Sequence, residues 1–425
     1  MDGRRVSRRQ VVSALAAGAI LPAFGPALAG RAKPLTPPVW LGAGLNASGA
    51  AARSGLLFPV LSSVAGRSGQ RLDDRQALTW VTRAVGNALR EDNPMGIRFL
   101  TGSQSLQRDE TTGVSMVYDF EMVNAVPTTM EDGSTYAHAY YLACATGLVS
   151  ILDGNGYWRI LAAYPFFLKQ ALDGGKMDRA RVEAWAPGAA AQVAQEFHTG
   201  AGTSVKSVFV KRTNRFANWK DGYNDKFVRV MPVRFAPQAA QALQEFRIDK
   251  LLTPELVGVI ASSELCSGLD IGVLPYVNTD ALSRFQFQVA DYGNLPQQPP
   301  ADADVSLRVR ITVDLVRREV VPVQRQGYVQ VRRGIRFQAE FLGLDDQPIA
   351  TLRAAGVDTD RMFSVEDSTP PRDFQFYQSA LEKAISTLFH GLRRRDKAAL
   401  ASIGVNYDEA KAPIEALLKV ADNLR

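Results

Sequence analysis

Alternation of apolar and polar residues along the chain predicts two separate sets of β-strands. The expected strands are Val114–Met122, Thr135–Leu152 and Trp158–Leu168 in the first set, and Val305–Val316, Ile335–Leu344 and Ile349–Ala354 in the second. Because every second side chain is apolar, each strand is expected to bury one face and to turn the other towards solvent. The run Asp153-Gly154-Asn155-Gly156 supplies residues that tolerate positive φ, so it predicts a hairpin turn inside the first set.

Helical spacing of apolar residues predicts helices beside both strand sets. The expected helices are Asp74–Arg90, Asp178–Ala186, Ala189–Phe197, Pro237–Phe246, Pro254–Glu264, Gln378–Arg393 and Pro413–Leu424. Gln378–Arg393 has the most continuous apolar stripe, which is typical of a helix that packs against other elements. Glycine-rich Gly42–Ser54 and proline-containing Asn294–Asp304 are expected to be loops.

The two strand sets follow one another at a nearly constant offset. A shift of 191 residues places Val114-Ser115-Met116 on Val305-Ser306-Leu307, and a shift of 192 places Asp153 on Asp345. An internal duplication explains this spacing, although two unrelated antiparallel hairpins produce similar patterns. The predicted fold class is therefore α+β, with two lobes, each an antiparallel sheet packed with helices.

Changes in composition suggest where these parts begin and end. A proline- and glycine-rich leader and loop is expected over residues 30–71, the first α+β lobe over 72–225 and the second over 226–396. Residues 397–425 are expected to form a carboxyl-terminal helical tail.

Three segments of the second strand set and its closing helix resemble envelope-assembly proteins of the curli-secretion and TolB amino-terminal type. These segments read DVSLRVRITVDL, RRGIRFQAEFLGLDDQPIATLRA and ALEKAISTLF. The resemblance covers residues 300–392 well and residues 72–168 loosely, and it has no signature residue that carries a function. It implies a non-enzymatic envelope factor that binds proteins or cell-wall components, in some members as a ring.

The amino terminus has the three parts of an export signal. Arg8 and Arg9 precede an apolar stretch, Val11–Phe24, and the segment ends with Ala27-Leu28-Ala29. The Arg8-Arg9 pair resembles the twin-arginine signal, although the usual Phe and later Lys are missing, which leaves the general secretion route open. A membrane helix is the alternative, but 14 apolar residues are fewer than the roughly 20 needed to span a bilayer. We expect a signal peptide over residues 1–29 and a protein of the periplasm that does not span the membrane.

The charge of the remaining chain is close to balanced. The full sequence has 49 Lys and Arg against 43 Asp and Glu, and residues 1–29 hold four of the arginines and one of the aspartates. Residues 30–425 therefore keep a net charge of only +3, which argues against nucleic acid as a partner. Of the two cysteines, Cys144 and Cys266, the sequence leaves open whether they form a disulfide or remain thiols.

The sequence contains no motif for a named reaction. Its three histidines are isolated, without metal-ligand spacing or a nucleophile nearby, and no glycine run has the context of a nucleotide-binding loop. We therefore predict no catalytic residue, no cofactor and no metal ligand. The interpretation favoured is a non-catalytic binding or envelope-assembly factor. The alternative is a periplasmic hydrolase whose site is assembled from residues distant in sequence.

Aromatic residues are the most concentrated candidates for binding. Tyr140, Tyr157, Trp158 and Trp219 are expected on a surface that binds an envelope protein or a glycan, with core packing as the plainer alternative. Self-association into a homo-oligomer is a further expectation. Neither the ligand nor the partner follows from the sequence.

Overall fold

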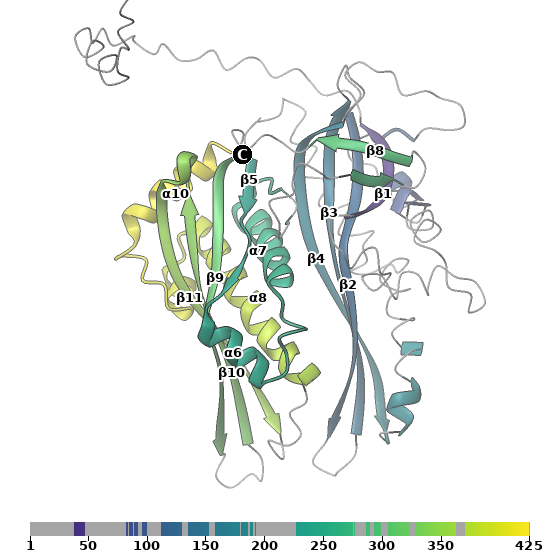
Figure 1. Ribbon diagram of the computed structural model, residues 1–425, viewed down its shortest axis with the longest axis vertical. Helices are drawn as coiled ribbons and strands as arrows, with labels where there is room; N and C mark the ends of the chain where they lie inside the picture. The colour runs from purple at the N-terminus through teal and green to yellow at the C-terminus, as the bar shows by residue number, and fades with distance from the viewer. Residues whose placement is uncertain are drawn as a thin grey trace, which may run out of the picture.

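The structure is a computed structural model of the 425-residue chain. It describes residues 38–46, most of 82–99, 112–129, 135–152, 158–178, much of 180–192, 227–274, 276, 286–289, 293–298, 305–322, 329–362 and 370–424. The protein has two β-sheets with helices between and beside them (Figure 1). The α+β class and the two lobes predicted from the sequence are therefore confirmed.

The first sheet is built around three long antiparallel strands. It contains β1 (Val39–Asn46), β2 (Thr112–Thr129), β3 (Thr135–Leu152), β4 (Trp158–Met177), β7 (Gln286–Val289) and β8 (Gly293–Gln298). Strands β2, β3 and β4 pair in sequence order, and β8 and β7 link β4 back to β1, so the hydrogen-bonded order closes on itself. The short strands β7 and β8 come from a segment that lies far beyond the first lobe in the sequence.

The second sheet is open and has the order β11-β10-β9-β5, with β6 also paired to β9. Its strands are β5 (Phe227–Val230), β6 (Arg234–Phe235), β9 (Val305–Pro322), β10 (Val329–Leu342) and β11 (Pro348–Met362). A short 3-10 helix, η6 (Leu344–Asp346), joins β10 to β11. In β9, β10 and β11 buried and more exposed residues alternate, as the sequence pattern predicted.

Both sheets are mixed, which corrects the expectation of purely antiparallel sheets. Strand β1 pairs parallel to β2, and β5 pairs parallel to β9. Parallel neighbours need a long crossover connection, and each of these pairs has a helical segment in the connection between its strands. The alternating pattern identifies a strand but carries no information about the direction of its neighbour.

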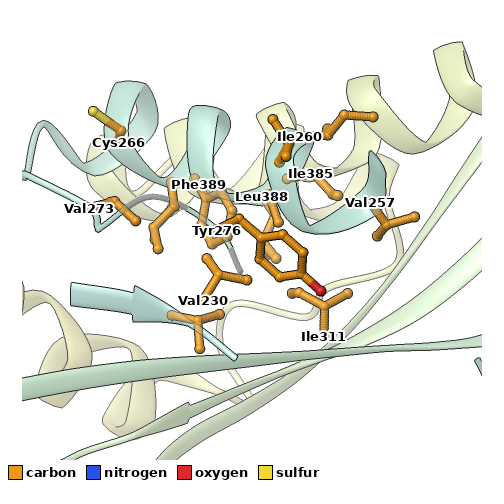
Figure 2. Close-up of a cluster of buried hydrophobic side chains, with 14 of the residues drawn as sticks. Val230, Val257, Ile260, Cys266, Val273, Tyr276, Ile311, Ile385, Leu388 and Phe389 are labelled. Atoms are coloured by element: carbon orange, nitrogen blue, oxygen red, sulfur yellow. The ribbon is translucent and has the colours of Figure 1, made fainter. Parts of the chain in front are cut away.

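Two helices lie between the sheets (Figure 1). Helix α8 (Pro370–Arg394) packs on β10 and β11, and α7 (Pro254–Leu269) contacts both α8 and β4. Twelve of the 16 residues of α7 are buried, so this helix is covered on all sides instead of presenting one apolar stripe. Val257 and Ile260 of α7 and Leu388 and Phe389 of α8 belong to one apolar cluster with Val230 and Ile311 of the second sheet (Figure 2).

Shorter helices cover the second sheet and the end of the chain. They are α6 (Pro237–Glu245), α9 (Lys397–Ser402) and α10 (Lys411–Asp422). Near β1, the described residues of 82–91 are helical, and the side chain of Thr82 accepts a hydrogen bond from Ala43 N at 2.9 Å. Residues 180–185 are also helical. None of the described helices is long and apolar enough to span a membrane.

Two segments that were expected to be loops, Gly42–Ser54 and Asn294–Asp304, begin with strand residues, 42–46 of β1 and 294–298 of β8, and their remaining residues lie outside the described part of the structure. Strand β1 contains Gly42, whose φ of 105° lies beside a register shift between Trp40 and Gly42, so the glycine serves a bulge inside the strand. Strand β8 contains Pro296, which pairs with Gln286 of β7. Strand β8 pairs with β4 through only two residues, Gln297 and Gln298, so Pro296 needs no hydrogen bond on that side.

The two halves of the chain share an order of elements. In each half a strand (β1 or β5) is followed by a helical segment, and a residue beyond that segment forms an isolated parallel bridge to the strand, Val39 with Arg98 and Val228 with Val273. Three long antiparallel strands come later in each half, but in the second half β7 and β8, which belong to the first sheet, precede them. The internal duplication stays a prediction.

Candidate functional site

The residues predicted from the sequence for binding do not form a described surface patch. Trp158 is 1% exposed and lies in the core, where a side chain on Gly113 would meet its ring. Tyr140 belongs to β3, but its side chain lies outside the described part of the structure, as do Tyr157 and Trp219. Trp158 therefore does not contribute to an exposed binding surface, and the rest of that prediction stays untested.

The other sequence-based candidates are either buried or lie outside the described residues. Arg8 and Arg9 of the expected export signal lie outside the described residues. Cys266 is buried in α7, while the side chain of Cys144 is outside the described residues, so their pairing stays open. Among the described residues, no three His, Cys, Asp or Glu side chains are grouped in a way that could hold a metal ion.

A group of charged side chains that sequence reasoning missed lies where α8 begins against the second sheet. We call it the arginine–aspartate cluster, and it consists of Arg318 of β9, Arg333 of β10, Asp360 of β11, and Arg372 and Asp373 of α8. Arg333 and Asp373 are 0% and 2% exposed, although both are charged. Burial of this kind is rare unless each charge is paired.

Every charge in the cluster has a partner within the cluster. Arg333 Nε donates to Asp373 Oδ1 at 2.6 Å, and Arg318 Nη1 donates to Asp373 Oδ2 at 3.1 Å. Arg372 binds Asp360 through two parallel hydrogen bonds, Nε to Oδ2 at 2.6 Å and Nη2 to Oδ1 at 2.9 Å. The two ion pairs meet where Arg333 Nη1 lies 3.8 Å from Asp360 Oδ2. Both carboxylates thus accept charge-assisted hydrogen bonds from guanidinium groups.

Aromatic rings enclose the cluster. The guanidinium of Arg318 lies 4.7 Å from the ring centre of Phe246, and that of Arg333 lies 4.9 Å from the ring centre of Phe376. Phe246 also stacks on Tyr377 at 5.8 Å between ring centres. Burial, with the nearby charge of Asp373, raises the pKa of the Tyr377 hydroxyl far above its ordinary value, so this group stays protonated.

The geometry of the cluster suits a structural role. A general base must have a carboxylate oxygen free to accept a proton from a substrate, but here both aspartates accept hydrogen bonds from arginines inside a buried site. The cluster ties the first turn of α8 to three strands. Arg333 occupies an inward position between Val331 and Ile335, and a charged residue in an apolar register is the signal that could have identified it from the sequence.

The opposite face of the same sheet carries exposed arginines. We call this surface the arginine face and define it by Arg317 of β9, Arg332 and Arg336 of β10, and Arg353 and Arg361 of β11, all of which are exposed. Within it, Arg336 Nε lies 2.9 Å from Asp314 Oδ1, and Arg353 Nε donates to Gln338 Oε1 at 3.2 Å. The described carboxylates of this face are Asp314, Glu319 and Glu340, fewer than its arginines.

Comparison with known proteins gives only distant likenesses. No protein-family model matches the chain, and no curated protein is similar enough to count as a match. A Xanthomonas campestris protein of family DUF330 has a similar structure over 42% of this chain and 86% of its own, with 10% identity and a TM-score of 0.20. A protein described as a neuraminyllactose-binding hemagglutinin homolog from Helicobacter pylori matches 47% of this chain and 90% of its own, with 12% identity and a TM-score of 0.20. Likenesses this weak carry no argument about function.

Proposed function

We propose that this protein is a non-catalytic binding or assembly factor of the bacterial cell envelope. The observation that carries the proposal is the arginine face, a broad and exposed part of a sheet whose other face packs against α8. Five exposed arginines on three neighbouring strands form a positively charged surface, which favours contact with an acidic partner. Packing of the sheet on a helix favours binding at its free face, because less ordering remains to be done when the partner arrives.

The alternative, a hydrolase whose site is assembled from distant residues, has less support. The described cluster that brings such residues together is the arginine–aspartate cluster, and both of its carboxylates accept hydrogen bonds from arginines. A hydrolytic role would require one of them to leave its arginine and reach a substrate. That movement would leave a guanidinium group buried without its carboxylate partner, which is strongly unfavourable.

Photocrosslinking in growing cells tests the binding role. A photoreactive amino acid at Val357, in the middle of the arginine face, is expected to form a covalent adduct of defined mass with a partner. The same amino acid at Ser402, an exposed residue of α9, serves as the matched control and is expected to form none. An adduct with twice the mass of the protein would show that the partner is a second copy of this chain. Absence of an adduct from Val357 would rule out the proposed role for this face.

Export to the periplasm, by the twin-arginine route, is part of the same proposal and has its own test. We expect cleavage after Ala29, so intact mass measurement of the protein from cells should give a chain that begins at Gly30. Replacement of both Arg8 and Arg9 by lysine should leave the uncleaved precursor in the cytoplasm. A precursor that is still processed after this replacement would point to the general secretion route.

A further inference from the structure

The centre of the arginine face is apolar, with Gly334 and Val357 beside one another. Gly334 of β10 lies between Arg317 of β9 and Val357 of β11 in the hydrogen-bonded register. Val357 is 61% exposed, the highest value among the large apolar side chains that the structure describes as exposed. A methyl group added at Gly334 would have its nearest neighbour, Val357 Cγ2, at 3.8 Å, so it would fit there in ordinary van der Waals contact.

The fold itself does not require a glycine at this position. Gly334 does not have a positive φ, and its neighbours leave room for a Cβ atom. A glycine inside a strand weakens the strand, and it often marks a place where another chain or a ligand approaches closely. An approach from outside the molecule is consistent with the exposure of the neighbouring Val357.

Charged groups surround this apolar centre. Arg332 and Arg336 flank Gly334 along β10, and Arg317 lies across from it on β9. Residues 305–362 contain no lysine, so all the positive charge of the face comes from guanidinium groups. Protein–protein interfaces typically have an apolar centre with a polar rim, and they are enriched in arginine and depleted in lysine. Guanidinium groups also bind carboxylates through two parallel hydrogen bonds.

We propose that the arginine face docks an acidic surface of a partner protein, with an apolar side chain of the partner seated over Gly334 and against Val357. This inference deepens the binding role proposed above and rests on it. An anionic membrane surface is the other source of negative charge. It is less favoured because Glu319, directly opposite Arg332 on the same exposed face, would repel a uniform layer of anionic headgroups.

Binding of a simple acidic polymer tests the charge requirement. Fluorescently labelled poly-L-glutamate is expected to bind the purified protein at low salt. The double substitution Arg332→Gln with Arg353→Gln should weaken this binding about tenfold, while Lys250→Gln with Lys419→Gln, which removes the same charge elsewhere, should change it by less than about twofold. No binding of the polymer, or equal losses in both double variants, would overturn the inference.

Lipid vesicles test whether the negative charge that the arginine face binds comes from an anionic membrane. Vesicles of phosphatidylcholine with and without phosphatidylglycerol are expected to sediment equally little protein. Sedimentation that requires phosphatidylglycerol and is lost in the Arg332→Gln, Arg353→Gln variant would overturn the inference in favour of a membrane. A contrary result with poly-L-glutamate or with vesicles does not affect the crosslinking test at Val357. The inference about an acidic partner can therefore fail while the proposed binding role stands.

The substitution Gly334→Leu tests the apolar centre. Because a Cβ at this position meets no atom closer than 3.8 Å, the variant should keep the melting temperature of the parent protein, and the crosslinked adduct from Val357 should fall about tenfold. An adduct of unchanged yield in a folded Gly334→Leu variant would show that no partner side chain seats there.

Discussion

Neighbouring residues in the second sheet take opposite roles because successive side chains of a strand point to opposite faces. Arg332 is exposed on the arginine face, whereas Arg333 beside it is 0% exposed and bonded to Asp373. Arg317 and Arg318 divide in the same way, with the second in the cluster. A shift of the register by one residue would therefore exchange the buried network with the binding surface.

The arginine–aspartate cluster should be sensitive to removal of one charge. Asp373→Asn leaves Arg333 buried without its ionised partner, so we expect a loss of about 3–5 kcal/mol in the free energy of unfolding. Urea denaturation followed by circular dichroism measures this loss. Lys397→Ala, which breaks an exposed ion pair with Asp408, is the control and should cost about 1 kcal/mol or less. Equal losses would contradict a structural role for the cluster.

Replacement by alanine should have opposite effects on stability at two glycines of the second sheet. A Cβ on Gly356 would collide with the carbonyl group of Ala380 in α8, so Gly356→Ala should cost about 1–3 kcal/mol or more by forcing the helix outwards. Gly334→Ala, on the other face, should be neutral or slightly stabilising. Thermal unfolding of the two variants provides the comparison. A lower melting temperature for Gly334→Ala than for Gly356→Ala would refute this packing.

At the scale of elements, the carboxyl-terminal helices are held to the end of α8 by polar contacts as well as by their apolar faces. Arg395, which follows α8, forms two hydrogen bonds of 2.9 Å to Glu415 of α10, and the hydroxyl of Tyr407 donates to the same carboxylate at 2.7 Å. Ile414, Leu417 and Leu418 of α10 are buried beneath them. The sequence predicted α10 from its apolar spacing, but not the carboxylate that connects it to α8.

Glu415 should make this attachment sensitive to acid. The hydrogen bonds from Arg395 and Tyr407 lower the pKa of Glu415 from 4.5 to about 2. A lowered pKa in the folded state stabilises the protein above the ordinary pKa, and this stabilisation is lost as pH falls from about 5 towards 2. Glu415→Gln should therefore reduce the dependence of stability on pH in that range. Urea denaturation at several pH values measures the slope, and Glu409→Gln should leave it unchanged.

At the scale of the molecule, the two sheets share one core. Val273 N donates to Ala163 O of β4, and Leu274 N donates to Val228 O of β5, both at 2.8 Å, so one segment bonds to both sheets. Side chains of both sheets, of α7 and of α8 belong to one continuous cluster. We therefore expect the two lobes to unfold together instead of as separate domains.

Tryptophan fluorescence can test this coupling because all five tryptophans lie before residue 226. Leu388→Ala in α8 should cost about 2–5 kcal/mol, and the unfolding transition seen by fluorescence should shift by the same amount as that seen by circular dichroism. Leu344→Ala, at a residue that is 57% exposed, is the control with little expected effect. A fluorescence transition unmoved by Leu388→Ala would show that the lobes unfold independently.

Local patterns in the sequence determined much of the fold. The alternation of side chains identified the six long strands of the described residues, and β3 has the predicted bounds, Thr135–Leu152. Helical spacing likewise identified α6, α7, α8 and α10. These features follow from nearest neighbours along the chain, since one buried face per element imposes a period on the sequence.

Contacts between distant residues decided the rest. Pairing of β7 and β8 with the first sheet, the parallel direction of β1 and β5, and the burial of Trp158 all depend on which segments meet in space. The same holds for the candidate sites. Alternation along a strand turns Arg332 and Arg333 to opposite faces, but the strand predicted from the sequence began only at Ile335. The tertiary structure extended β10 back to Val329 and brought Asp373 to Arg333, and it left Arg332 in solvent because α8 packs on one face of the sheet.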